Sequence, residues 1–192
     1  PVIALLAGSR KQEIKANLSL MAEIAGTWNN DYQMVVAAAP GIDDEFYREC
    51  LGDNPATLLR GQTYRILQHS LAALVTSGTA TLETALFRVP QIVCYNMKAG
   101  RLANLGKKLL LKVPYISLVN LIASREVVPE LVAADMNPTN LQGYMISILP
   151  GGSARQRQLR DYEEVAQKLG EPGAPAKTAR LMTEYLRNRQ QH

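Results

Sequence analysis

A run of small and hydroxylated residues, Ser77-Gly78-Thr79-Ala80-Thr81, separates a short apolar segment from a helix-like pattern. A strand, a tight turn and a helix in that order leave backbone N–H groups unpaired at the start of the helix, where the dipole adds roughly half a positive charge. Gly78 lets a ligand approach the main chain, and Ser77, Thr79 and Thr81 add hydroxyl donors. Such a turn is typical of a phosphate site.

Glu83 follows this turn, and a carboxylate beside a phosphate must be aimed at some other group. The residue three positions earlier is Ala80, so a capping box does not explain Glu83. Acidic residues hold the ribose in other nucleotide sites, and this analogy favours a contact with sugar hydroxyls. The alternative is that Glu83 only complements the helix dipole.

A second loop opens at Gly8, directly after the apolar segment at the start of the chain. Ser9 and Gln12 have the spacing of a capping box, which is a structural interpretation. The functional interpretation is that Arg10 and Lys11 reach a phosphate from the carboxyl end of a strand, where doubly wound sheets bind ligands. The two are compatible. The loop lacks a G-x-G-x-x-G pattern, which counts against a nicotinamide dinucleotide.

Composition narrows the class of protein. The 192 residues carry a formal charge of +4, compatible with an anionic ligand or an anionic membrane surface. The sequence contains no apolar run long enough for a transmembrane helix. It opens on a strand-like segment rather than a signal peptide. Because of this strand-like start, we expect the chain to be one lobe of a larger protein. Cys50 and Cys94 lack metal-type spacing and fit a reducing cytosol. The acidic run 43–45 is better explained by a helix start, so no metal site is predicted.

Apolar strand-like runs alternate with helix-like patterns along the first two-thirds of the chain. The runs are nearly continuous, as in a parallel sheet covered on both faces, so we predict a Rossmann-like, doubly wound α/β fold. After Pro138 the pattern is all-helical, and we predict a nucleotide-sugar-binding domain over 1–152 and C-terminal helices over 153–192. The strands are expected at Val2–Ala7, Tyr32–Ala39, Ala56–Leu59, Leu71–Thr76, Gln91–Tyr95 and Ile116–Leu118. The helices are expected near 11–26, 43–50, 63–69, 79–88, 98–112, 139–149, 153–169 and 176–189.

The segment 97–115 mixes leucines with basic residues. It suits either an anionic bilayer surface or the solvated face of an ordinary amphipathic helix. Its scarce aromatic residues count against nucleic acid. The candidate membrane contacts are Arg101, Lys107, Lys108 and Lys112.

Asn120 breaks an apolar run just after an expected strand end, so it is either a loop brace or a ligand contact. Glu126 and Glu130 lie four residues apart and could share a helix face, although Pro129 interrupts it.

Four motifs, in this order, resemble the lipid-A-disaccharide synthase family over most of residues 1–131. They are Leu5-Leu6-Ala7-Gly8-Ser9-Arg10-Lys11-Gln12-Glu13-Ile14, then Thr76-Ser77-Gly78-Thr79-Ala80-Thr81-Leu82-Glu83, then Val89-Pro90-Gln91, and last Val119-Asn120-Leu121-Ile122-Ala123 with Pro129-Glu130-Leu131. The resemblance implies the carboxyl-terminal, UDP-binding lobe of a type B glycosyltransferase.

The resemblance also implies a reaction and a set of contacts. The family joins UDP-2,3-diacylglucosamine to 2,3-diacylglucosamine 1-phosphate, forming a β-1,6 disaccharide and UDP, without a metal or cofactor, at the inner face of the bacterial inner membrane. It assigns the turn 77–81 to the UDP phosphates and Glu83 to the ribose. Ser9, Arg10 and Asn120 complete the expected UDP-binding set, and the last two should face the cleft between lobes.

The same resemblance places the acyl acceptor and the catalytic base in an amino-terminal lobe, so we expect this chain alone to bind UDP without catalysing transfer. Residues 153–189 would pack on a partner lobe, exchange with a second copy or fold back. Two other functions stay open: a different UDP-sugar enzyme of the same fold, such as a UDP-N-acetylglucosamine 2-epimerase, or a non-catalytic nucleotide-binding module.

Overall fold

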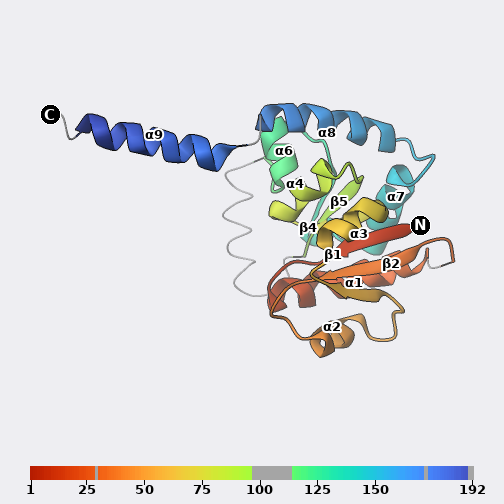
Figure 1. Ribbon diagram of the computed structural model, residues 1–192. Helices are drawn as coiled ribbons and strands as arrows, with labels where there is room; N and C mark the ends of the chain where they lie inside the picture. The colour runs from red at the N-terminus through yellow and green to blue at the C-terminus, as the bar shows by residue number, and fades with distance from the viewer. Residues whose placement is uncertain (29, 97–113, 171–172, 190–192) are drawn as a thin grey trace.

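The computed structural model describes residues 1–28, 30–96, 114–170 and 173–189, and within them six parallel strands form one sheet (Figure 1). Each strand is a short apolar run that pairs in parallel with its neighbours in the order β3-β2-β1-β4-β5-β6. The strands are β1 (Val2–Leu6), β2 (Gln33–Ala38), β3 (Thr57–Arg60), β4 (Ser70–Thr76), β5 (Gln91–Tyr95) and β6 (Glu130–Val132).

Helices cover both faces of this sheet, which confirms the predicted doubly wound α/β fold. Successive strand residues point to opposite faces, so Ile3 and Leu5 are buried in one apolar cluster and Ala4 and Leu6 in another. On the first face lie α1 (Lys11–Gly26), α2 (Asp44–Leu51) and α7 (Pro138–Ile148). On the second lie α3 (Thr63–His69), α4 (Thr79–Leu86), α6 (Leu118–Ala123) and α8 (Arg155–Leu169).

The predicted strand over 116–118 is wrong. The edge of the sheet is instead β6, where Glu130 pairs with Val93 and leads into a short 3-10 helix, η1 (Ala133–Asp135). Ser117 caps α6, because its side-chain oxygen accepts a hydrogen bond from Asn120 N. A short apolar run in the sequence is compatible with a buried strand and with the start of a buried helix. Here the N-cap at Ser117 starts a helix. The helix expected near 98–112 lies outside the described residues.

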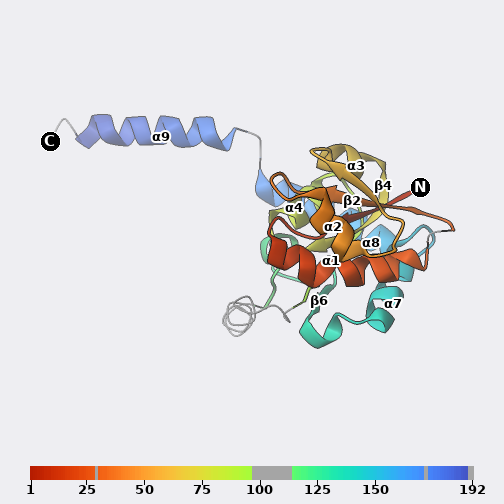
Figure 2. The ribbon, with the colours of Figure 1, turned by 90° about the horizontal axis from the view of Figure 1, so that it is seen from below.

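The two C-terminal helices behave differently. α8 packs on the body, since Tyr162 and Val165 are buried among residues of α4, α6 and β5. α9 (Ala174–Arg189) projects away from the body in both views (Figures 1 and 2) and exposes four large apolar side chains, Leu181, Met182, Tyr185 and Leu186. The domain boundary at residue 152 and the crossing of residues 153–189 to another lobe remain predictions. In this structure α8 packs against the preceding domain.

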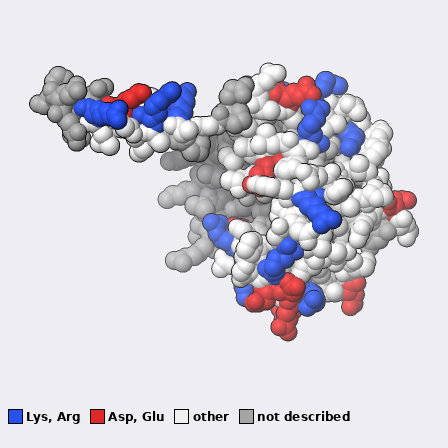
Figure 3. All heavy atoms as spheres, in the orientation of Figure 1, with Lys and Arg blue, Asp and Glu red and all other residues white. Residues whose placement is uncertain are grey.

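Charged side chains are dispersed over the face of the molecule that Figure 3 shows. On the face seen in Figure 3, basic and acidic groups are interspersed, and the acidic side chains at the bottom of the view lie over α2. Within the described ranges, the protein has no helix that is both long and apolar enough to cross a bilayer.

The turn between α7 and α8 depends on Gly152. A Cβ atom at this position would lie 2.3 Å from the carbonyl oxygen of Ser147, so the chain would have to shift. We expect Gly152→Ala to lower the free energy of unfolding by roughly 3 kcal/mol in urea titrations. Gly143 in α7 has open space at its Cβ position, so the matched variant Gly143→Ala should raise stability by about 0.5–1 kcal/mol. Equal effects of the two variants would contradict this account of the turn.

Candidate functional site

A hollow of about 400 Å³ opens at the carboxyl edge of the sheet, at the ends of β1, β2 and β4. Because β1 lies between β2 and β4, the connections diverge here, and open α/β sheets bind their ligands at such a switch point. Most of the predicted site residues line the hollow: Ser9, Arg10, Ser77, Gly78, Thr79, Ala80 and Glu83. Thr81 and Asn120 do not.

The turn before α4 presents its main chain to the hollow. Gly78 is the N-cap, with φ of +147°, and no side chain caps the helix. The first residues of α4, Thr79 and Ala80, line the hollow, and N–H groups at a helix start lack intrahelical acceptors. The Ser77 and Thr81 hydroxyls are used inside the protein: Ser77 Oγ donates to Ile116 O at 2.7 Å, and Thr81 Oγ1 donates to Gly78 O at 2.8 Å. Each hydroxyl has a single proton, so the expectation that Ser77 and Thr81 add hydroxyl donors to the site is wrong for both, and Thr81 is in addition fully buried.

The loop after β1 is held by Glu13. Its Oε2 accepts a hydrogen bond from Ser9 N at 3.2 Å, and its Oε1 pairs with Arg10 Nη1 at 2.7 Å. The N-cap of α1 is Arg10, so the predicted capping box of Ser9 and Gln12 is wrong and Glu13 does that work. Gly8, with φ of +108°, is required here because a Cβ would lie 2.7 Å from Glu13 Oε2.

Arg10 lies at the mouth of the hollow, and its side chain is 75% exposed. Arg10 is the N-cap of α1 and Gly78 is the N-cap of α4, and both residues line the hollow. The two helices therefore begin at the same hollow, with the positive ends of their dipoles beside it. Exposed N–H groups, two helix N-termini and a guanidinium favour an anionic ligand with more than one charged group.

Glu83 lies where this hollow meets a second one of about 410 Å³ that runs along the start of α3. Its Oε1 accepts a long hydrogen bond of 3.3 Å from Tyr64 Oη, and the Tyr64 ring packs on Phe87 with centroids 5.2 Å apart. Most of the hydrogen-bonding capacity of the Glu83 carboxylate is therefore available to a ligand that spans the two hollows.

Thr76, the last residue of β4, also lines the hollow, although it is not among the residues predicted for the site. The residue is 3% exposed, and Oγ1 has no hydrogen-bond partner among the described residues. A buried hydroxyl without a partner is costly and is found where a bound group or a conformational change completes the hydrogen bonding. It marks the floor between the two loops as a polar site.

Asn120 is a brace and not a ligand contact. Its side chain is fully buried; Nδ2 donates to Val128 O and to Glu130 Oε1, and Oδ1 accepts from the N–H groups of Val127 and Val128. The expectation that Asn120 faces a cleft is therefore wrong for its side chain, which has no free donor or acceptor. Glu130 belongs to β6, so the helix face that it was expected to share with Glu126 does not exist.

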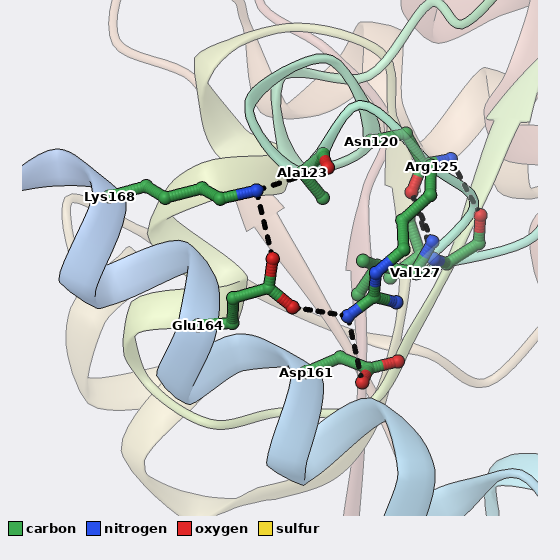
Figure 4. Close-up of polar contacts among 8 residues, drawn as sticks. Asn120, Ala123, Arg125, Val127, Asp161, Glu164 and Lys168 are labelled. Atoms are coloured by element: carbon green, nitrogen blue, oxygen red, sulfur yellow. Dashed lines mark hydrogen bonds and ion pairs between the residues drawn. The ribbon is translucent and has the colours of Figure 1, made fainter.

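The loop that follows α6 is tied to α8 (Figure 4). Arg125 Nη2 pairs with Asp161 at 3.1 Å and with Glu164 at 2.5 Å. Lys168 Nζ lies 2.8 Å from Glu164 Oε1 and donates to Ala123 O at 3.2 Å. The bonds to Lys168 and to Arg125 lower the pKa of the Glu164 carboxyl from 4.5 to about 2.

The proposed membrane contacts Arg101, Lys107, Lys108 and Lys112 lie outside the described residues. Among the residues that the structure does describe, His, Cys, Asp and Glu side chains form no group of three that could hold a metal ion.

Solved structures that share this fold include glycosyltransferases. The catalytic domain of cholesterol-alpha-glucosyltransferase from Helicobacter pylori superposes with a TM-score of 0.56 and 14% identity, covering 88% of this chain and 99% of that one. CalG4, the calicheamicin glycosyltransferase, gives 0.54 and 18%, covering 98% of this chain and 44% of the other. The fold is thus that of one lobe of a type B glycosyltransferase.

The family follows from the sequence match. A family model described as lipid-A-disaccharide synthetase matches residues 1–184, and the chain belongs to this family. The lipid-A-disaccharide synthase of Solibacter usitatus (strain Ellin6076) is 31% identical over 100% of this chain and 51% of its own length. That of Anaeromyxobacter dehalogenans (strain 2CP-C) is 35% identical over 96% and 49%. The chain spans about half the length of these curated relatives.

The ion-pair cluster on α8 should make stability depend on pH in a defined window. Because the folded-state pKa of Glu164 is depressed, its contribution is complete above the unfolded pKa and is lost as the pH falls toward the folded value. We expect the difference in unfolding free energy between the wild type and Glu164→Gln to shrink between about pH 4.5 and about pH 2, measured by urea titration.

The control for this experiment is a chain in which both Arg125 and Lys168 are replaced by Met. In that background Glu164→Gln should have no effect in the same pH window, because the groups that depress the pKa of Glu164 are gone. A shrinking difference that persists without the two cations would refute the assignment.

Proposed function

We propose that this chain is the UDP-sugar-binding lobe of an inverting glycosyltransferase, a lipid-A-disaccharide synthase. The whole enzyme joins UDP-2,3-diacylglucosamine to 2,3-diacylglucosamine 1-phosphate and releases UDP. The observation that carries the proposal is Glu83, an acidic side chain at the junction of two hollows, next to a helix N-terminus suited to phosphate. Membership of the family supports the same substrates.

Each part of the nucleotide has a matching part of the site. The diphosphate suits the starts of α1 and α4, where backbone N–H groups of the Ser77–Thr81 turn and the Arg10 guanidinium are at hand. The ribose hydroxyls are donors, and the half-buried Glu83 carboxylate is an acceptor with unused capacity. The base suits the second hollow, along the start of α3 and Tyr64.

The acceptor sugar, the catalytic base and the acyl chains are assigned to the other half of the protein. The chain spans about half of its relatives, and the hollow contains no residue that we assign as a base. We propose that transfer occurs at the interface between this lobe and an amino-terminal lobe, without a metal or cofactor, at the inner face of the bacterial inner membrane. α9 is the segment that would reach the other lobe or a second copy of the protein.

The first test is calorimetric titration of the chain with UDP. We expect Glu83→Ala to weaken binding about ten- to a hundredfold, because a charged acceptor loses its hydrogen bonds to the ribose. With 2′,3′-dideoxy-UDP as the ligand, wild type and Glu83→Ala should bind alike. If Glu83→Ala lowers the affinity for UDP and for 2′,3′-dideoxy-UDP by the same factor, Glu83 does not hold the ribose. A wild-type chain that fails to bind UDP would count against the proposed site.

A second test concerns catalysis. Because the proposed base and acceptor site lie in the other lobe, the chain should form no disaccharide from UDP-2,3-diacylglucosamine and 2,3-diacylglucosamine 1-phosphate, as followed by chromatography of radiolabelled product. A fusion of the amino-terminal lobe of a relative to this chain should form the disaccharide. Product from the isolated chain would show that the base lies within these 192 residues.

A further inference from the structure

Glu130 lies at the centre of a compact set of hydrogen bonds some distance along the chain from the hollow. Its Oε2 accepts from Ile116 N at 2.8 Å, and its Oε1 accepts from Ser117 N at 2.9 Å, Ser117 Oγ at 2.7 Å and Asn120 Nδ2 at 2.8 Å. Four donors on one carboxylate leave it little freedom, so the Ile116–Ser117 segment is fixed relative to β6.

This segment in turn contacts the turn before α4. The carbonyl oxygen of Ile116, on the residue whose N–H is bound by Glu130, accepts the hydrogen bond from Ser77 Oγ at 2.7 Å. Ser77 lines the hollow, whereas Glu130, Ile116 and Ser117 do not. Glu130 therefore has a path to the site through one carbonyl group and one hydroxyl group.

We propose that Glu130 is a positioning residue for the nucleotide site: by fixing the Ile116 carbonyl, it sets the place of Ser77 and hence the shape of the Ser77–Thr81 turn. The turn depends on this support because Gly78, with φ of +147°, has no side chain to hold it and α4 has no side-chain cap. The proposal rests on the proposed function, since it assumes that the turn binds the diphosphate.

The neighbouring elements keep the support rigid. Asn120 joins Glu130 to the backbone of Val127 and Val128, and Arg125 in the same loop pairs with Asp161 and Glu164 of α8. A carboxylate held by several hydrogen bonds can fix the position of the neighbouring glycine turn, and such preorganisation favours tight anion binding.

The test is a double-mutant cycle on UDP affinity. Glu130→Gln keeps the shape of the side chain and removes acceptor capacity, and Ser77→Ala cuts the same path at its other end. Each substitution should lower the affinity for UDP about five- to tenfold, which corresponds to the loss of one hydrogen bond. The double variant should bind UDP no more weakly than the weaker-binding of the two single variants. Glu126→Gln, which removes the same charge from an exposed position in the loop that precedes β6, should leave the affinity for UDP unchanged.

A second readout needs no ligand. In two-dimensional NMR spectra of the free chain, Glu130→Gln should shift the amide signals of Ser77, Gly78 and Thr79, and Ser77→Ala should shift those of Gly78 and Thr79. Glu126→Gln should shift none of them. If Glu130→Gln lowers the melting temperature but leaves these signals and the affinity for UDP unchanged, Glu130 is only structural and the proposal is wrong. If the amides shift while wild type shows no UDP binding, the proposed function fails and the mechanical link stands.

Discussion

Parallel pairing of β1 with β4 is the constraint on which the site depends. The register sets Leu5 beside Leu74 and Leu6 beside Val75, so the two strands end together and their loops open at the same edge of the sheet. The pairing joins segments about seventy residues apart and places the Gly8 loop next to the Gly78 turn. Because β2 and β5 lie on opposite sides of this pair, the two helices that follow diverge and leave a hollow between their N-termini.

The hollow combines positive and negative groups in a way that fits a nucleotide better than a simple anion. Two carboxylates line it, and their surroundings differ. Glu13 is bound to Arg10 and to the Ser9 N–H, so its charge is balanced and serves to shape the loop. Among the described residues, Glu83 has only a long hydrogen bond from Tyr64, and it lies away from the first turn of α4 at the second hollow. A ligand that carries both phosphates and hydroxyls satisfies these two environments together.

α8 supports the site although it lies outside the hollow. Gln158 exchanges two hydrogen bonds with the main chain of Gln91 at the start of β5, and Gln91 Nε2 donates to Thr81 O in the first turn of α4. The ion pairs of Arg125 tie the middle of the same helix, at Asp161 and Glu164, to the loop that follows α6. α8 thus touches both supports of the Ser77–Thr81 turn.

The sequence by itself determined the fold class and the core of the site. Continuous apolar runs, small-residue turns and helix periodicity are local signals, and they placed five of the strands, the turn at Gly78 and the acidic residue Glu83, because those features need only neighbours in the chain. Tertiary structure alone decided what each polar side chain binds. Glu13 took over the loop from Gln12, Thr81 turned inward, and Asn120 and Glu130 became braces; each outcome depends on a partner or a burial that only folding supplies. The edge strand moved from 116–118 to β6 for the same reason, since hydrogen-bond partners far along the chain chose between two apolar segments that look alike in the sequence.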